Sequence, residues 1–198
     1  MRFLQAVVFV PEYMQNWSIN MKIGLLRHYK VLKDFPKEKR LYSAEEVKQW
    51  FAEYDVAEIE YRKDPPKTTE WKACYSSPMS RAIKTARHLY DRDIIELEEL
   101  REIAAPVFST RLKLPFTVWA FFIRFSNLFN KQTRAEIKQT KKKINYVLDE
   151  ILKSNKEDVL IVSHAALMFY IRKELLKRGF TGPKFTIAKN GELYEFKL

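Results

Sequence analysis

Two short, almost entirely apolar runs constrain the fold of this chain more than any other feature. Residues 159–163 read VLIVS, and residues 22–27 read KIGLLR. A strand without polar alternation is typical of a parallel sheet whose two faces are both covered by helices. Because further strand-like runs at 72–76 and 94–97 alternate with helical patterns, the sequence predicts a three-layer α/β/α sandwich with a mostly parallel central sheet.

Local start and stop signals set the bounds of the other predicted elements. Ser43 followed by Glu46 is a capping box that opens an amphipathic helix. Ser77 is expected to cap a second helix, with Pro78 at its first position and its end near Tyr90. The remaining predictions are a long helix over 134–153, a later helix that reaches Arg178 and stops at Gly179, and a C-terminal hairpin with its turn at Asn190-Gly191.

The chain is expected to form one domain over residues 21–198, preceded by an extension of residues 1–20. The extension faintly resembles a secretory signal, but it has little positive charge before its apolar run and no small-x-small cleavage site. We therefore interpret it as an added segment or the product of an upstream start codon. No run approaches the roughly 20 apolar residues of a membrane span. The single cysteine, Cys74, fits a reducing compartment, so a cytoplasmic location is predicted.

The charge of the chain bears on its partners. It carries 36 Lys and Arg against 25 Asp and Glu, a formal net charge of +11. This excess attracts anions, but it does not separate nucleic acid, acidic lipid and phosphorylated metabolites. The basic run at 141–143 is interpreted as a solvated helix face. Because no RNA-binding aromatic signature or zinc finger accompanies it, nucleic acid is not an expected partner.

Residues 104–130, here named the cap segment, differ in composition from the rest of the chain. The cap segment is rich in phenylalanine, and its only charged residues are Arg111, Lys113 and Arg124. Three interpretations stay open: a helix packed on the core, a mobile apolar cap over an active site, and a helix that binds a membrane surface or a partner. Peripheral membrane contact through residues 119–129 therefore remains an alternative.

Histidine and arginine side chains are expected at the carboxyl ends of strands, where a parallel sheet collects functional groups. Arg27 and His28 follow the first apolar run, His164 follows the second, and Arg81 opens a helix between them. A phosphoryl group needs rigidly held cations and an aligned nucleophile. Arg27, Arg81 and His164 are the predicted phosphate-binding residues, and His28 is the predicted nucleophile. A cation in a helix's first turn is unfavourable unless an anion lies against it, which favours the same site.

The departing alcohol needs a proton, and Glu102 is predicted to supply it as general acid. A carboxyl group beside bound phosphate keeps its proton near neutral pH, because ionisation would place two negative charges close together. Glu98 and Glu99 are rival candidates, although neighbouring side chains on a strand point to opposite faces. The predicted catalytic set is Arg27, His28, Arg81, Glu102 and His164.

Other chemistries find little support in the sequence. Cysteine phosphatases use C-x5-R, whereas six residues separate Cys74 from Arg81, and one of them, Pro78, has no amide hydrogen to donate. The three histidines show no metal-ligand spacing such as H-x-x-x-H. His88 is interpreted as a surface or structural residue. No metal and no cofactor are expected.

These motifs, in this order, resemble those of the histidine phosphatase superfamily, also called phosphoglycerate mutase-like, in its branch 1. The strand ending in Arg-His matches Arg27 and His28, and SSPMSRAIKTA matches S-S-x-x-x-R-A-x-x-T-A with Arg81. LREI matches the L-x-E-I segment that carries Glu102, and the strand ending in Ser-His carries His164. The resemblance covers residues 21–198 and implies a phosphoglycerate mutase-like fold with these five residues at its site.

Two departures from the family pattern bear on the substrate. Tyr29 stands where Gly usually follows Arg-His and is expected to narrow or restack the mouth of the pocket. AAPVFSTRLKLPF replaces the Gly-rich, acidic stretch that often follows the acid in the family. Family mutases usually carry longer insertions and a glycerate-shaped polar pocket, which this sequence does not show. The predicted function is a metal-independent, histidine acid phosphatase-type phosphomonoesterase that forms phosphohistidine on His28 and acts on a small phosphorylated substrate. A phosphomutase and a non-catalytic phospholigand-binding or adaptor protein are the alternatives.

Overall fold

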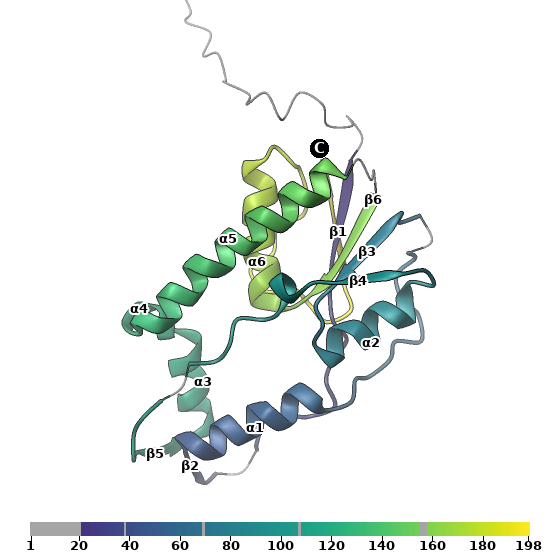
Figure 1. Ribbon diagram of the computed structural model, residues 1–198. Coiled ribbons are helices and arrows are strands. Elements are labelled where there is room, and N and C mark those ends of the chain that lie inside the picture. Colours follow the sequence, from purple (N-terminus) through teal and green to yellow (C-terminus); the bar gives the residue numbers. More distant parts are fainter. Residues whose placement is uncertain (1–20, 38, 69, 107, 155–157) are drawn as a thin grey trace, which may run out of the picture.

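A five-stranded sheet forms the centre of the protein (Figure 1). The computed structural model describes residues 21–198 except 38, 69, 107 and 155–157, so the predicted extension of residues 1–20 lies outside the described residues. Four strands run parallel, and β7 runs antiparallel at one edge. The strands, in their order across the sheet, are β4 (Ile94–Glu96), β3 (Ala73–Ser76), β6 (Asp158–Ser163), β1 (Lys22–Arg27) and β7 (Leu193–Lys197).

The two apolar runs of the sequence are the neighbouring inner strands β1 and β6. Their side chains alternate between two separate hydrophobic cores, so both faces of each strand are buried. On β1, Ile23 and Leu25 face one core and Leu26 faces the other. Gly24 shares the second face, where a Cβ would lie 2.7 Å from a ring carbon of Trp71. The absence of a side chain at Gly24 therefore leaves room for the Trp71 indole beside the strand.

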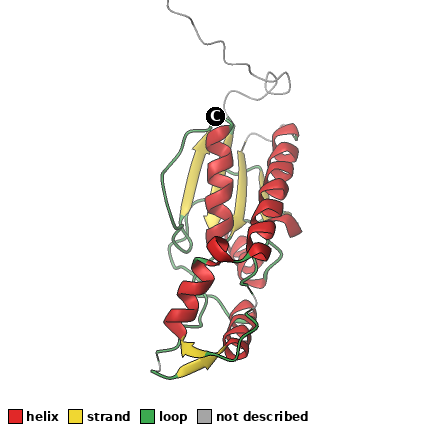
Figure 2. Ribbon diagram, turned by 90° about the vertical axis from the view of Figure 1, so that its left-hand side faces the viewer, coloured by secondary structure: helices red, strands yellow, loops and turns green. Residues whose placement is uncertain are grey.

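Helices cover both faces of the sheet (Figures 1 and 2). Helix α2 (Ser80–Leu89) packs on one face, and α5 (Lys131–Lys153) and α6 (Ala165–Lys177) pack on the other. The predicted three-layer α/β/α fold with a mostly parallel sheet is thereby confirmed. The long helix begins one turn earlier than predicted, because the Asn130 side chain accepts a hydrogen bond from the amide of Thr133 and caps it.

The start of α2 differs from the prediction. The helix begins at Ser80, and the position before it is Met79, which makes no side-chain cap. Ser77 and Pro78 continue from β3 in a non-helical path, and the Ser77 hydroxyl lies 2.8 Å from a ring nitrogen of His164. The serine that the sequence marks as a cap is instead a partner of the second histidine.

A small lobe lies beyond the carboxyl ends of the parallel strands, at the bottom of Figure 1. The predicted capping box at Ser43 and Glu46 is present. Tyr42, Val47, Phe116 and Trp119 form a core of their own, and the Trp119 indole donates to the Tyr42 carbonyl at 2.8 Å. The small lobe consists of β2 (Leu41–Ser43), α1 (Ala44–Val56), β5 (Lys113–Pro115) and α3 (Phe116–Arg124), with β2 and β5 paired antiparallel.

The cap segment thus contributes a strand and helix to the small lobe rather than one helix on the central core. After α3 it continues into α4 (Ser126–Phe129), which leads to α5. The beginning of the cap segment comes shortly after a 3₁₀ turn, η2 (Glu98–Leu100), in the chain. The cap segment's aromatic side chains Phe108, Phe116 and Trp119 pack with side chains of α1. Figure 1 shows α1 and α3 across from the sheet edge.

The C-terminal hairpin is present only in a wide form. The turn at Asn190-Gly191 forms as predicted, with Gly191 at φ +67°. Residues 185–189 are not a strand; one antiparallel bridge between Thr181 and Lys197 closes the loop, and β7 pairs with β1. The segment before the turn instead contacts the end of β1, where the Ala188 carbonyl accepts from the Arg27 guanidinium at 2.8 Å.

Candidate active site

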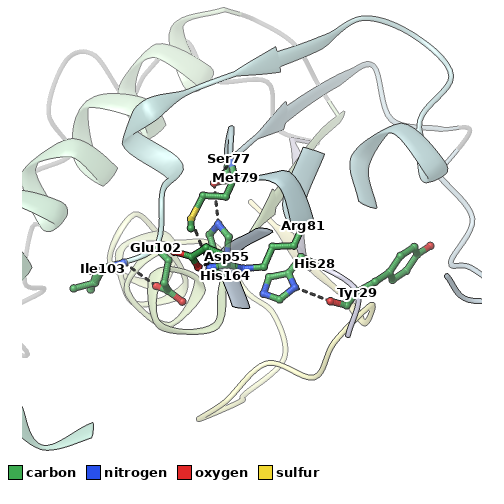
Figure 3. A network of polar contacts seen from close by, with 9 residues as sticks. All are labelled: His28, Tyr29, Asp55, Ser77, Met79, Arg81, Glu102, Ile103 and His164. Carbon is green, nitrogen blue, oxygen red and sulfur yellow. Dashed lines mark hydrogen bonds and ion pairs between the residues drawn. The ribbon is translucent and has the colours of Figure 1, made fainter. Parts of the chain in front are cut away.

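The parallel register of β1 and β6 brings the two predicted histidines together. Arg27 at the end of β1 is paired with Ser163 at the end of β6, so the residues that follow leave the sheet at the same level. The His28 amide donates to the Ser163 carbonyl at 3.0 Å. The ring centroids of His28 and His164 lie 5.1 Å apart, with their planes tilted by 55°. Figure 3 shows the two rings beside Arg81 and Glu102.

One ring nitrogen of His28 forms a hydrogen bond with the backbone, which leaves the other nitrogen to act as a nucleophile. Its Nδ1 lies 2.6 Å from the Tyr29 carbonyl, which can only accept, so Nδ1 carries the proton and Nε2 has a lone pair. The Asn190 side chain fixes the same loop by donating to the His28 carbonyl at 2.9 Å. Burial, with Arg81 and then Arg27 adding repulsion, lowers the pKa of His28 to about 3. The ring is therefore neutral at ordinary pH, as a nucleophile must be.

His164 is completely buried at the amino end of α6. Its Nε2 lies 2.8 Å from the Ser77 hydroxyl, and its Nδ1 is buried without a hydrogen-bond partner among the described residues. Burial is the main cause that lowers the pKa of His164 well below its ordinary value; repulsion from His28, which acts only when both rings are protonated, and from the nearby arginines adds to it. An adjacent dianion would oppose these effects and favour the protonated ring.

Arg27 and Arg81 place two guanidinium groups at the same site. Arg81 is buried in the first turn of α2, and it donates to Asp55 at 2.7 Å and contacts the Met79 sulfur at 3.6 Å. Arg27 donates to the Ala188 carbonyl. The Nε atoms of both arginines are buried and lack a partner among the described residues. Buried donors of this kind are usually satisfied in proteins, so the arrangement suits an anion that would accept from them.

Glu102 follows η2 in the chain, and its carboxyl group lies beside the start of α6. One carboxylate oxygen accepts from the Ile103 amide at 3.0 Å, and the other accepts from the Ala166 amide at 3.3 Å. Burial raises the pKa of Glu102, although the two amides and the two arginines act in the opposite direction. Its rivals Glu98 and Glu99 lie in η2, and neither lines the cavity described next.

A cavity of about 1130 Å³ separates the sheet edge from the small lobe. Arg27, His28, Arg81 and Glu102 lie along its wall, so the described structure brings these four predicted residues to one space. His164 lies behind that wall, in ring contact with His28. The arrangement offers a neutral imidazole nitrogen, a carboxyl group and several cationic or polar donors to a single guest molecule.

Tyr29 does not narrow the mouth of the cavity, contrary to our expectation. Its side chain is buried away from the site, where it packs with Val31 and Ile59, and Figure 3 shows its ring directed away from the two histidines. The Tyr29 hydroxyl bonds to Nδ1 of the exposed His88 at 3.0 Å.

Sequence reasoning missed two partners of the site. Asp55 comes from α1, and no local motif links it to Arg81; only the folded chain shows the pair. Ser77 was visible in the S-S motif but was assigned to a helix cap. Cys74 lies on β3 within the second core and does not line the cavity, and burial raises the pKa of its thiol to about 12.

Among the described residues, no group of three or more His, Cys, Asp or Glu side chains is arranged to hold a metal ion. No helix in the described part of the chain combines the length and apolar character that crossing a bilayer requires.

Comparison with solved structures shows the same fold at low sequence identity. Phosphoserine phosphatase from Entamoeba histolytica, in complex with 3-phosphoglyceric acid, aligns with a TM-score of 0.51 at 20% identity over 88% of this chain and 89% of its own. Phosphoglycerate mutase from Bacillus anthracis str. Sterne aligns at 0.52 and 18% identity over 90% and 88%. Mycobacterial glucosyl-3-phosphoglycerate phosphatase, in complex with inorganic phosphate, aligns at 0.52 and 14% over 88% of each chain.

No protein with a curated description matches the sequence. The family model described as histidine phosphatase superfamily (branch 1) matches residues 63–198. The match includes Arg81, Glu102 and His164 and begins after Arg27 and His28, which the fold brings to the same place. The chain belongs to branch 1 of the histidine phosphatase superfamily.

Proposed function

We propose that the protein is a metal-independent phosphomonoesterase in which His28 carries the phosphoryl group during the reaction. The observation that supports this most strongly is the contact between the two histidine rings beside two arginines with unpartnered buried Nε atoms. A phosphoryl dianion meets there both a neutral nucleophile and the donors its oxygens need. The predicted cytoplasmic location and a small phosphorylated substrate are part of the proposal.

In the first step, His28 Nε2 attacks phosphorus and the bond from phosphorus to the ester oxygen breaks. Burial and the adjacent phosphoryl dianion both favour the protonated form of Glu102, which gives its proton to the departing alkoxide, so a neutral alcohol leaves. Arg27, Arg81 and a protonated His164 neutralise the charge on the other three oxygens. The carbonyl of Tyr29 holds Nδ1–H and supports the positive charge that the ring gains.

In the second step, water attacks the phosphohistidine. Glu102, now ionised, accepts a proton from that water, and the bond between phosphorus and Nε2 breaks. Inorganic phosphate leaves, and Glu102 and His28 return to their starting forms. The two amides that bond Glu102 keep its carboxylate in place through both steps.

Hydrolysis of p-nitrophenyl phosphate in excess EDTA tests this proposal, with wild type, His28→Ala and His88→Ala compared. His88 is exposed and does not line the cavity, so its variant is a matched control for loss of an imidazole. We expect full activity with EDTA, none in His28→Ala, and near wild-type activity in His88→Ala. Activity that persists in a folded His28→Ala or His28→Asn protein, or that EDTA abolishes, contradicts the mechanism. Phosphate binding without turnover would support the phospholigand-binding alternative.

A further inference from the structure

The cavity is much larger than the reacting group needs. Its volume of about 1130 Å³ slightly exceeds the roughly 300–1,000 Å³ typical of pockets for drug-sized ligands. The charged groups of the proposed chemistry, Arg27, His28, Arg81 and Glu102, occupy only one part of its lining. A substrate that consists of little more than a phosphoryl group would leave most of the lining exposed to water.

Aromatic and aliphatic side chains make up much of the remaining wall. Trp50 and Phe51 come from α1, Phe125 from the end of α3, Ile137 from α5 and Phe169 from α6. None of these five side chains is fully buried, and Phe125 is 41% exposed. Apolar surface that lines a concave space without being covered favours a ligand that would remove it from water.

The charges elsewhere in the lining do not make this wall a polar one. Lys48 pairs with Glu45 at 3.3 Å, and Arg101 pairs with Glu98 at 3.2 Å, so two of the cations have carboxylate partners. Arg124, in the last turn of α3, adds a positive charge to the lining. Its guanidinium would form an ion pair with an acidic group at the far end of a long ligand.

We infer that the natural substrate is a phosphomonoester of a bulky apolar or aromatic alcohol, whose body lies against α1, α6 and the cap segment. The inference rests on the proposed phosphatase function and adds the substrate class to it. Both the amphipathic shape of the ligand and its orientation follow from the lining: the phosphoryl group meets the histidines, and the alcohol extends toward the aromatic wall.

Straight-chain alkyl phosphates test the inference, because their leaving groups are chemically alike from ethyl to decyl while the buried apolar length grows. All are assayed below the concentration at which they form micelles. Each fully buried methylene should raise kcat/KM by up to about fourfold until the cavity is filled. Hydrolysis at rates that stay within about twofold across the series would overturn this inference and leave the proposed function standing. Failure to hydrolyse any ester, including p-nitrophenyl phosphate, would overturn both.

A filling substitution gives a second, independent test. Ala52 on α1 is exposed and lines the cavity, whereas Gln49 is exposed on the same helix but lies outside it. Ala52→Trp should lower kcat/KM for decyl phosphate by about tenfold or more, since several methylenes lose their place, and should leave ethyl phosphate nearly unchanged. Gln49→Trp should change neither. Equal values for Ala52→Trp and Gln49→Trp with decyl phosphate would contradict the assigned position of the alcohol.

A final arm distinguishes a dissolved substrate from a membrane lipid of the same chemistry. Phosphatidic acid in phosphatidylcholine vesicles is compared with monomeric decyl phosphate at equal concentration of accessible ester. Faster turnover of the vesicle-held ester would support the substrate class with a lipid as its source. Turnover of the dissolved ester alone would support the class with a soluble alcohol as its source.

Discussion

Ser77→Ala, compared with Ser76→Ala, isolates the contribution of the Ser77 hydroxyl to the site. Both serines lie at the end of β3 and both are completely buried. The Ser76 hydroxyl donates to the backbone carbonyl of Ser77 at 3.0 Å, whereas the Ser77 hydroxyl lies 2.8 Å from His164 Nε2 and also accepts from the Met79 amide at 3.3 Å. The two substitutions therefore delete the same atom from neighbouring, equally buried positions, and only one of them removes a partner of the histidine.

The expected magnitude follows from that contact. When phosphate binds, His164 becomes protonated and both ring nitrogens must donate, Nδ1 to the phosphate and Nε2 to Ser77. Without the Ser77 hydroxyl, a buried donor is left unsatisfied at a cost of about 1–3 kcal/mol. If this cost falls on the transition state, kcat/KM drops by roughly 5- to 150-fold. Ser76→Ala should lose only stability.

Steady-state hydrolysis of p-nitrophenyl phosphate, inhibition by inorganic phosphate and thermal unfolding are measured on both variants. Both should melt at lower temperature, by about 2–4 °C for each kcal/mol lost in a chain of this size. Only Ser77→Ala should also bind phosphate more weakly and turn over more slowly. If kcat/KM of Ser77→Ala stays within a factor of two of Ser76→Ala, Ser77 does not support His164 in the reacting complex.

Three further substitutions test other parts of the account. The chemistry needs neutral His28, whose pKa is lowered to about 3, and protonated Glu102, whose pKa burial raises. With an alkyl phosphate, whose alkoxide needs the acid, kcat/KM should therefore fall below about pH 3 and again as pH rises through the pKa of Glu102. Glu102→Gln should remove the alkaline fall once the profile is corrected for the substrate's own ionisation near 6. Ser43→Ala removes the hydroxyl that caps α1 and should lower the free energy of unfolding by about 1 kcal/mol in urea titrations, with kcat unchanged. Gly24→Ala would place a methyl group against Trp71, so we expect a loss of about 1–3 kcal/mol in the same titrations, and an unchanged midpoint would show that the indole can move.

Continuous buried patterns were the best guide to the fold. The runs that became β1 and β6 specify burial on both faces by composition alone, and the Ser43 capping box is complete within four residues. The predicted start of α2 was wrong. A serine followed by a proline is typical of a helix N-terminus, but in the folded chain the Ser77 hydroxyl contacts His164 and the helix begins at Ser80. Local preference gave way to a contact between residues far apart in the sequence.

The site shows the same division between local and distant information. Arg27 ends β1 and His28 follows it, so the position of both residues could be predicted from the strand. Asp55 could not be assigned to Arg81, because its position depends on how the small lobe sits over the sheet edge. Tyr29 was misplaced because the sequence does not tell which side of a turn a bulky ring will take; it packs against Gly191, where a Cβ would meet its ring at 2.8 Å.

The most direct test of the central claim is to trap the phosphorylated protein and locate the phosphoryl group. The enzyme is mixed with p-nitrophenyl phosphate, quenched in alkali, where phosphohistidine survives, and analysed by peptide mass spectrometry. Glu102→Gln should accumulate the intermediate, because an aryl leaving group needs little help from an acid while water still needs the missing base. The account predicts one acid-labile phosphoryl group, on His28, and none in His28→Ala. A phosphoryl group on another residue, or continued turnover with no covalent intermediate in wild type or Glu102→Gln, would contradict it.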